Sequence, residues 1–389
     1  MDITVKKFGG SSLASATSIK RCAATVADTA SKGCAVVVVV SAMGTSTDHL
    51  SEMLSQFCPN SRESDVVLSS GEQVSAGLFA AALFDLGIKA ESLLGWQVPI
   101  FTDSTHSCAK VVGVGVDLIM QKLQSGTIPV IAGFQGVCDG KLTTLGRGGS
   151  DITAAALSCA LGAKDCQIYT DVSGVMPLNP KDFSGYQKPF KSIGRDQILE
   201  MGLETDVLHN RAVDIAKKSD FAVQISSSFD LHHKQKTSIV QNIEEDFSFA
   251  VTYKKNRVLV KSKDYCKIFN LATKSGIETD LCALFEKHLV TVFSHDDFIK
   301  IEQLVDTDTS YQDIALVNLV GSSQACSAQN IGQIFDLLSD IDILFLNTTK
   351  IKIAFAIFQF DLKKVMMRLE KLLEDSACNK QIKEICTAI

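Results

Sequence analysis

A glycine-rich stretch from Thr143 to Asp151, with the sequence TTLGRGGSD, has the residue types of an anion-binding loop. The residues that follow, 152–161, are helix formers with apolar side chains at helical spacing, so Ser150 or Asp151 is expected to cap a helix. The N-terminus of a helix presents free backbone N–H groups and the positive end of the helix dipole. Arg147 adds a guanidinium that can grip a carboxylate or a phosphate with two hydrogen bonds. We therefore expect an anionic ligand at this loop.

A second glycine turn lies close to the N-terminus. Residues 3–8 have a strand pattern that includes Lys7, and the sequence GGSS at 9–12 then leads into a predicted helix over 13–30. A strand, a glycine turn and a helix in this order bring backbone amides against a phosphate group. The chain thus has two places, far apart in sequence, that suit anions.

The elements around these two turns alternate between strands and helices. Strands are predicted at 34–40, 89–93, 127–132, 163–170 and 222–226, and helices at 47–57, 66–86, 152–161, 197–203 and 206–219. Such alternation is typical of an α/β fold with a parallel-rich sheet between layers of helices. The loops that begin at Gly9, Ser41, Gly133 and Thr170 each follow a strand, so we expect them to line one edge of the sheet and to share one site.

The pattern changes after a polar stretch at 226–237. Short strands are predicted at 249–253 and 257–261, and the last part has a strand, helix, strand, strand, helix order at 314–319, 328–338, 341–346, 351–358 and 362–373. This order predicts a small ferredoxin-like α+β module. We expect three segments, namely a large domain at 1–235, a first and less clearly patterned module at 245–310 and a second module at 311–389.

Composition narrows the class of protein. The 389 residues are 46% hydrophobic and 21% charged, as in a folded protein, and the net charge of −6 provides no electrostatic footprint for nucleic acid or acidic membranes. The N-terminus has no apolar signal segment, and the longest apolar runs are far short of a membrane span. Twelve cysteines are scattered without paired spacing, which indicates reduced, mostly buried thiols and a cytoplasmic protein. No residue is predicted to be a metal ligand.

Together the motifs resemble those of aspartate kinases, members of the amino-acid kinase family that carry C-terminal ACT domains. The resemblance rests on KFGGSS at 7–12 and LGRGGSD at 145–151, and it extends to VSAMG at 40–44, SGE at 70–72, AGFQG at 132–136, TDV at 170–172 and VLH at 207–209. It is close over residues 1–230 and looser beyond them. The amino-acid kinase fold and the ACT modules are what it implies for the architecture.

For activity, the resemblance implies phosphoryl transfer from ATP to the side-chain carboxylate of L-aspartate, giving 4-phospho-L-aspartate on the way to lysine, threonine and methionine. The nucleophile is already ionised at neutral pH, so positioning and charge neutralisation carry the reaction. Lys7 would stabilise the transferring phosphoryl group, Arg147 would clamp the aspartate carboxylate, and Glu72 would pair with its ammonium. Asp151 would either orient Lys7 or act through Mg²⁺. The other implied substrate-binding residues are Ser41, Thr47, Phe134, Thr144 and Ser150.

The nucleotide side of the site is implied less completely. The implied ATP-binding residues are Lys7, Gly9, Gly10, Ser11, Thr170, Asp171, Met176 and Lys181. Asp171 would reach ATP or cap a turn. The family has an aromatic residue where this chain has Met176, an arginine where it has Lys181, and a lysine where it has Asp206. The last change reverses a charge close to a triphosphate, which is repulsive.

The segment 341–353 resembles the strand-turn-strand with which ACT domains hold an end-product amino acid, so lysine or threonine is the expected effector and a homodimer through these modules is the expected assembly. Modules kept for dimer packing alone are the alternative. For the whole chain, two other functions stay open: a catalytically weak homologue that binds amino acids and regulates a partner, and a kinase of another small carboxylate such as glutamate or acetylglutamate.

Overall fold

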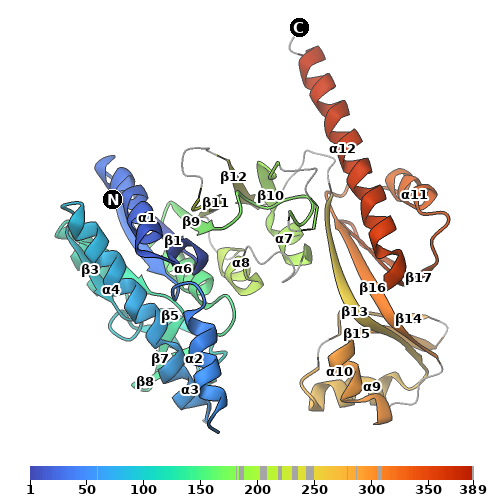
Figure 1. Cartoon of the computed structure of the whole chain (residues 1–389), viewed down its shortest axis with the longest axis horizontal. Coiled ribbons are helices and arrows are strands. Elements are labelled where there is room, and N and C mark those ends of the chain that lie inside the picture. The colour runs from blue at the N-terminus through green and yellow to red at the C-terminus, as the bar shows by residue number, and fades with distance from the viewer. Residues whose placement is uncertain are drawn as a thin grey trace. The chain divides into compact units, whose positions relative to one another are not determined.

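The structure is a computed structural model of the chain, and it describes residues 1–58, 60–180, 182–183, 188–201, 208–217, 221–229, 235–241, 249–277, 279–285, 287–304 and 309–387. The chain divides into two compact units, Met1–Val175 with Pro189–Ile243, and Met176–Lys188 with Glu244–Ile389. Figure 1 labels most of the elements of both. Residues 176–188 belong to the second unit although they fall within the segment predicted as one continuous catalytic domain.

An eight-stranded sheet forms the centre of the first unit, in the order β10-β12-β11-β9-β1-β2-β6-β3 (Figure 1). Every neighbouring pair is parallel except β11 with β12. The valine run of β2 is almost wholly buried, as a strand covered on both faces requires. The strands are β1 (Ile3–Phe8), β2 (Ala35–Val40), β3 (Ala90–Leu93), β6 (Ile128–Ala132), β9 (Asp165–Thr170), β10 (Ser192–Gly194), β11 (Ala222–Ser227) and β12 (Lys236–Val240).

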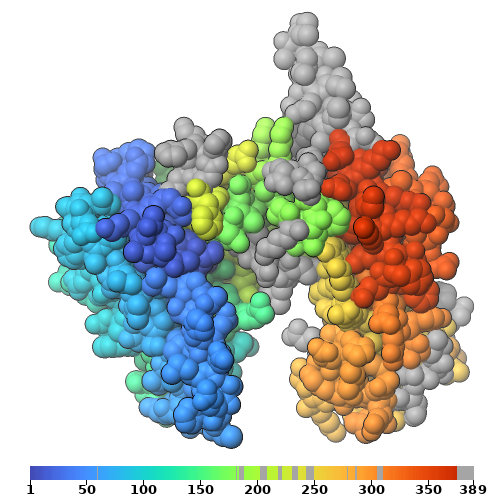
Figure 2. Space-filling model, viewed as in Figure 1, coloured from blue at the N-terminus to red at the C-terminus, as the bar shows by residue number. Residues whose placement is uncertain are grey.

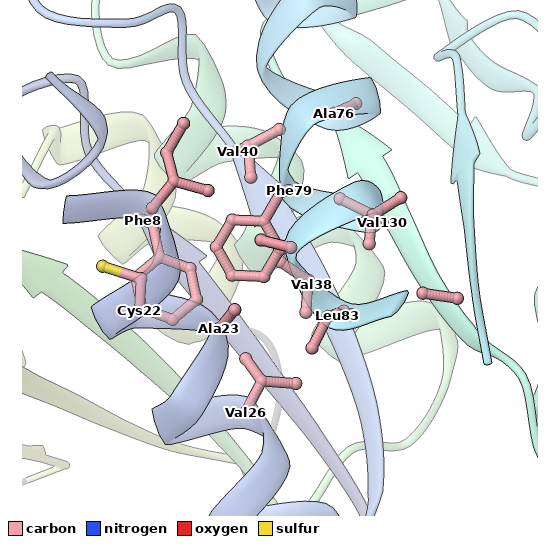
Figure 3. Close-up of a cluster of buried hydrophobic side chains, with 14 of the residues drawn as sticks. Phe8, Cys22, Ala23, Val26, Val38, Val40, Ala76, Phe79, Leu83 and Val130 are labelled. Carbon is pink, nitrogen blue, oxygen red and sulfur yellow. The ribbon is translucent and has the colours of Figure 1, made fainter. Parts of the chain in front are cut away.

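Helices α1 (Ala16–Ser31) and α4 (Ser70–Asp85) pack on this sheet through one apolar cluster (Figure 3). Phe8 of β1 lies between Phe79 of α4 and Tyr169 of β9, with ring centroids 5.2 and 4.8 Å away. Helix α6 (Gly149–Ala160) packs against β1, β2 and β9. The remaining helices of the unit include α5 (Asp117–Gln124), α7 (Arg195–Met201) and α8 (Asn210–Lys217).

The segment Ser61–Asp85 is long and apolar enough, by length and composition alone, to cross a membrane. Half of the apolar 18-residue stretch within it is buried in the protein. The segment is not one continuous helix, because Ser69 separates α3 (Ser61–Leu68) from α4. The fully buried Phe79 and Leu83 of α4 belong to the core just described. Core packing therefore accounts for its apolar composition.

A separate four-stranded sheet, in the order β5-β4-β7-β8, carries the loop that leads to α6. Its strands are β4 (Ile100–Thr102), β5 (Val111–Val114), β7 (Gln135–Cys138) and β8 (Lys141–Thr144). Helix α3 packs against β8, and α2 (Ser46–Ser55) packs against α3. Because α2 has no buried residue, it lies at the surface, within the blue region of Figure 2. This sheet was not predicted from the sequence.

The second unit is built on a six-stranded antiparallel sheet, in the order β14-β15-β13-β16-β18-β17. One apolar core packs α11 (Ala328–Leu337) and α12 (Leu362–Thr387) on β16 and β18, and another packs α9 (Tyr265–Lys274) and α10 (His295–Ile299) on β13 and β15. The strands are β13 (Ala250–Ser262), β14 (Leu281–Phe285), β15 (His288–Ser294), β16 (Thr309–Val320), β17 (Ile343–Thr348) and β18 (Lys352–Phe358).

The structure confirms the predicted α/β fold and most of the predicted elements, including the strand, helix, strand, strand, helix order at the C-terminal end. The predicted helix over 66–86 is two helices, and the predicted strands at 249–253 and 257–261 are the single bulged strand β13. The expectation of mostly buried thiols is wrong, because five of the ten cysteines whose side chains are described are exposed: Cys58, Cys108, Cys159, Cys266 and Cys282.

Candidate active site

The four loops predicted to share a site lie together at the carboxyl edge of the central sheet. The amide of Gly9 donates to the carbonyl of Tyr169 at 3.1 Å, and the amide of Ser41 donates to the carbonyl of Phe8 at 3.1 Å. The amide of Gly133 likewise donates to the carbonyl of the last residue of β2 at 3.0 Å. These bonds continue the strand pairing into the loops. The prediction of one shared edge is therefore confirmed.

Lys7 and Asp151 form an ion pair between the first strand and the start of α6, with Lys7 Nζ 2.5 Å from Asp151 Oδ1. The side chains are 11% and 10% exposed. Two residues 144 positions apart in the sequence thus meet as a nearly buried pair of opposite charges. Because Asp151 sits in the first turn of α6, the ammonium of Lys7 is held beside the amides of that turn, where an anion would bind.

The glycine turn after β1 supplies free amides of its own. The amide of Gly9 is engaged with Tyr169, so this residue does not offer the phosphate-binding N–H that the sequence analysis assigned to it. The amides of Gly10 and Ser11 have no hydrogen-bond partner within the part of the chain that the structure describes. The backbone at Gly10 also lies close to that of Ala42, because an added Cβ would be 2.8 Å from the Ala42 carbonyl oxygen. Among the described residues of this turn, Gly10 and Ser11 are therefore the ones whose amides could receive an anion.

The loop that precedes α6 has a left-handed backbone. Gly146 and Gly148 have φ of +75° and +65°, and Gly148 is the N-cap of α6 with no side-chain hydrogen bond. The predicted cap at Ser150 or Asp151 is therefore wrong, since both residues already lie in the first turn. Gly148 packs so closely on His209 that an added Cβ would lie 2.2 Å from the Cβ of that residue. Arg147, between the two glycines, is exposed and forms no ion pair with any described residue.

Phe134 and Ser150 lie against this same loop. Phe134 has a φ of +69°, and its amide donates to the hydroxyl of Thr153 in α6 at 3.1 Å. An added Cβ on Gly149 would come within 2.5 Å of the Phe134 ring, and one on Gly133 would come within 2.7 Å of the Ser150 hydroxyl oxygen. The sequence motifs at 132–136 and 145–151 are therefore packed into one small volume, which explains their need for glycine.

Glu72, in the first turn of α4, is 4% exposed. Its Oε1 accepts a hydrogen bond from the amide of Ala42 at 3.0 Å, while its Oε2 is buried and receives no donor from the described residues. Burial raises the pKa of Glu72 to about 7, against the opposing effect of the Ala42 amide. A buried carboxylate oxygen without a donor costs free energy, so this side chain is suited to a cationic group of a ligand.

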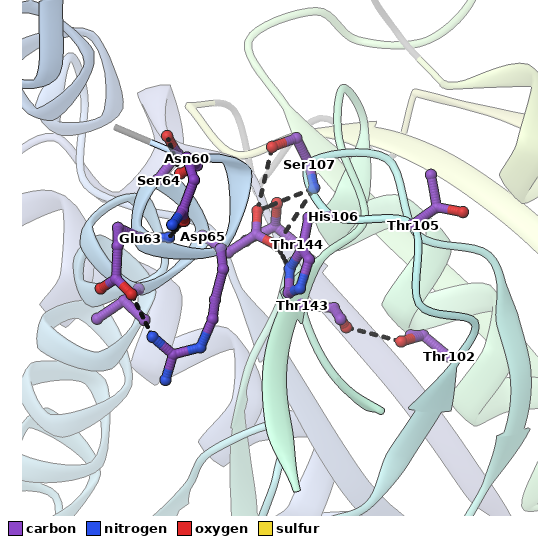
Figure 4. Close-up of polar contacts among 12 residues, drawn as sticks. Asn60, Glu63, Ser64, Asp65, Thr102, Thr105, His106, Ser107, Thr143 and Thr144 are labelled. Atoms are coloured by element: carbon purple, nitrogen blue, oxygen red, sulfur yellow. Dashed lines mark hydrogen bonds and ion pairs between the residues drawn. The ribbon is translucent and has the colours of Figure 1, made fainter. Parts of the chain in front are cut away.

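The other predicted substrate-binding residues differ in what they contact. Ser41 and Thr47 are partly exposed, in the loop after β2 and in the first turn of α2. Thr144 is buried, and its hydroxyl donates to Asp65 of α3 at 2.5 Å (Figure 4). Its hydroxyl proton is therefore committed to a side chain that the sequence analysis did not single out.

On the nucleotide side, Thr170 and Asp171 follow β9 in the first unit, and the Thr170 hydroxyl donates to Asp171 at 3.0 Å. The carbonyl of Thr170 accepts from the amide and the hydroxyl of Ser228. Met176 is part of the second unit. Lys181 and Asp206 lie outside the described residues, so their predicted roles stay predictions.

Sequence reasoning missed two side chains that hold the loops of the site. Asp65 joins α3 to β8 as described, and Arg211 of α8 donates to the carbonyls of Leu145 at 2.6 Å and Ala109 at 2.5 Å. His209, two residues before Arg211, has its pKa lowered by burial and by the nearby guanidiniums of Arg211 and Arg147. Arg211 lies two residues after the recognised VLH motif at 207–209, and a basic residue so close to that motif was the available signal.

Comparison with known proteins finds relatives that match nearly the whole chain. The model of the amino acid kinase family matches residues 2–227. The aspartokinase of Geobacillus stearothermophilus is 36% identical over 96% of this chain and 97% of its own, and aspartokinase 2 of Bacillus subtilis is 32% identical over 96% and 98%. Both matches run through the second unit as well as the first.

Solved structures show the same fold. Aspartokinase III of E. coli, in complex with aspartate and ADP in its R-state, matches with a TM-score of 0.79 at 22% identity, covering 95% of this chain and 99% of its own. The aspartate kinase of Synechocystis matches with a TM-score of 0.55 at 28% identity over 95% of this chain and 69% of its own. The family model covers more than half of the chain and the curated relatives match it nearly end to end, so the chain belongs to the amino acid kinase family and, within it, to the aspartokinases.

Proposed function

We propose that the chain is an aspartate kinase, which transfers the terminal phosphoryl group of ATP to the side-chain carboxylate of L-aspartate. The observation that carries the proposal is the arrangement of charges at one sheet edge: the Lys7–Asp151 pair, the buried Oε2 of Glu72, which has no donor among the described residues, and the exposed guanidinium of Arg147. An amino acid with a second carboxylate has the matching ammonium and carboxylate groups. The two curated relatives named above are aspartokinases, and their matches to this chain cover 97% and 98% of their own length.

In this proposal Glu72 holds the substrate ammonium, and Arg147 holds a substrate carboxylate with two hydrogen bonds. Ser41, Thr47, Phe134 and Ser150 complete the pocket, while Thr144 stands behind it, because its hydroxyl proton is committed to Asp65. Lys7 neutralises charge on the transferring phosphoryl group, helped by the free amides of Gly10 and Ser11. No base is required, because the attacking carboxylate is ionised at neutral pH. Asp151 orients Lys7, and the 2.5 Å ion pair supports this role over an action through Mg²⁺.

ATP would bind beside Thr170 and Asp171, as Mg²⁺–ATP, and the nucleotide contacts expected of Met176 and Lys181 stay predictions. The described residues contain no group of three or more His, Cys, Asp or Glu side chains that could hold a metal. Mg²⁺ keeps much of its coordination in water and phosphate oxygens at nucleotide sites, so a resident cage is not needed. The E. coli relative, which was solved with aspartate and ADP, supports the pairing of substrate and nucleotide.

The second unit is proposed to be regulatory. Its two halves, 245–310 and 311–389, would be a first and a second ACT module that bind lysine or threonine and pair two chains into a homodimer in the cytoplasm. The predicted effector hairpin is the β17–β18 pair, closed by a bond from the Thr349 amide to the Lys352 carbonyl. A relative from E. coli solved in complex with lysine and aspartate supports lysine as the first effector to test.

The test is the rate of ADP release with aspartate, glutamate or acetylglutamate as acceptor. We expect turnover with aspartate, a loss of at least about 100-fold in Arg147→Ala, and inhibition by lysine or threonine. Turnover on another acid alone would favour a different carboxylate kinase. No turnover, together with no calorimetric binding of a non-hydrolysable ATP analogue, would favour a silent regulatory homologue.

A further inference from the structure

The fully buried carboxylate of Asp65 contacts two other segments, one at 106–107 and one at Thr144, where the loop 145–148 begins; this loop is called the substrate loop below (Figure 4). Asp65 Oδ1 accepts from the Thr144 hydroxyl at 2.5 Å and from the Ser107 amide at 3.0 Å. Asp65 Oδ2 lies 2.6 Å from His106 Nδ1. The Ser107 hydroxyl adds a longer bond at 3.4 Å. A carboxylate buried this deeply is costly unless donors surround it, and here both oxygens have them.

The segments joined at Asp65 belong to different parts of the fold. Thr144 ends β8 and starts the loop that carries Arg147, and its carbonyl accepts from the amide of Ala109 at 2.9 Å. Asp65 itself is on α3, which is separated by Ser69 alone from α4. The start of the substrate loop is therefore fastened both to α3 and to the segment around 106–109.

The same helix pair carries the other substrate contact. Glu72 lies seven residues after Asp65, in the first turn of α4. The junction between the two helices is also held, because Gln135 Nε2 donates to the carbonyl of Ser69 at 2.8 Å. A continuous connection of helices and hydrogen bonds thus runs from Glu72, through the α3–α4 junction, to the loop that carries Arg147.

We propose that Asp65 is a positioning residue for substrate recognition: it fixes the spacing between Glu72 and Arg147 by holding Thr144 to α3, and so sets the affinity for the amino-acid substrate. This inference rests on the proposed function of the site, and it adds a residue that touches no substrate. A displacement of about 1 Å in a positioning group is enough to reduce catalysis by about 100-fold.

Asp65→Asn keeps the size of the side chain but replaces one acceptor oxygen with an NH₂ donor. That donor then faces either the hydroxyl of Thr144 or the donor groups at 106–107. Thr144→Val removes the hydroxyl and keeps the shape, while Thr144→Ser retains the hydroxyl. Asp165→Asn is the matched control, because Asp165 is a partly buried aspartate at the opposite, amino end of β9.

In steady-state assays we expect the KM for aspartate to rise at least about tenfold in Asp65→Asn and in Thr144→Val, with the KM for ATP changed less than about twofold. The double variant should lose no more than about threefold beyond the worse single variant, because both remove the same link. Thr144→Ser and the control should stay within about threefold of the wild type. Unchanged KM for aspartate, equal rises in both KM values, or multiplying losses in the double variant would overturn the inference.

A second measurement tests, without any substrate, whether Asp65 holds the loop in place through Thr144. Hydrogen–deuterium exchange of the free protein should be at least about fivefold faster across residues 143–149 in Thr144→Val, with β1 and β2 unchanged. Unchanged exchange across 143–149 would overturn the positioning role. If the wild type does not phosphorylate aspartate, the proposed function fails, and this exchange result still decides whether Asp65 holds the loop.

Discussion

Replacement of Glu72 by glutamine is the most informative single change in the site. Burial raises the pKa of Glu72 from 4.5 to about 7. Between these values the folded protein binds a proton that the unfolded chain does not bind, so this residue makes the stability fall as the pH rises through that window. The full loss of folding stability from the buried charge of Glu72 is present above about pH 7 and absent below about pH 4.5. A shift of this size corresponds to about 3 kcal/mol.

Glu72→Gln removes the charge and leaves an oxygen that can still accept the hydrogen bond from the amide of Ala42. We therefore expect the variant to be more stable than the wild type at pH 8, by up to about 3 kcal/mol, and to have a much smaller advantage at pH 5. The assay is urea denaturation of both proteins at the two pH values. A variant that is less stable than the wild type at pH 8, or an advantage that grows toward pH 5, would refute the reasoning.

The same variant should bind aspartate more weakly. A hydrogen bond to a charged group contributes about 1.5–3 kcal/mol, so the KM for aspartate should rise about 10- to 150-fold. In the wild type, kcat/KM for aspartate should fall as the pH drops below about 7, because a protonated Glu72 cannot pair with an ammonium, and the variant should lack this limb. Glu91→Gln, at an exposed carboxylate paired with Lys122, is the control and should change neither measurement. An acid limb that persists in Glu72→Gln would mean that another group causes it.

Three further variants test neighbouring parts of the site. Asp151→Asn should lower kcat about 100-fold at an unchanged Mg²⁺ requirement, because it frees Lys7; a large rise in the Mg²⁺ concentration for half-maximal rate would instead mean a role through the metal. Arg147→Lys should raise the KM for aspartate about tenfold and leave the KM for ATP unchanged, since a lysine cannot grip a carboxylate at two points; equal effects on both would contradict this. Gly148→Ala should lower kcat/KM at least about tenfold in a protein with wild-type circular dichroism, because its Cβ would collide with His209; wild-type kinetics would contradict this.

The first unit shows why some features are readable from sequence and others are not. The valine run of β2 and the turn after Lys7 are local patterns, and both predict a buried strand and a loop at its end. The cap of α6 was predicted at a serine or an aspartate by the usual preference, but the close approach of His209 requires a glycine with positive φ at position 148. That requirement comes from a residue 61 positions away, so no local rule contains it.

The positioning network is non-local in the same way. Asp65 lies 41 residues from His106 and 79 residues from Thr144, and in the sequence it looks like any acid on a polar helix face. The four-stranded sheet was missed because its strands are three or four residues long and mix polar and apolar side chains. The individual site residues, by contrast, lie in motifs that resemble those of a known family, and their roles stay predictions.

The assignment of residues 176–188 to the second unit has a consequence for how the chain folds during synthesis. Leu178 is buried in the core of that unit, and the carbonyl of Pro177 accepts from the amide of Val251 in β13. This segment leaves the ribosome about 70 residues before the strand that receives it. The segment cannot pack while β9 and β11 are being made on either side of it, because the strand that it contacts has not been synthesised. It therefore stays unpacked until β13 emerges from the ribosome. A ribosome-bound chain that ends near residue 243 should therefore expose Leu178, and chaperones that bind apolar segments would find one there.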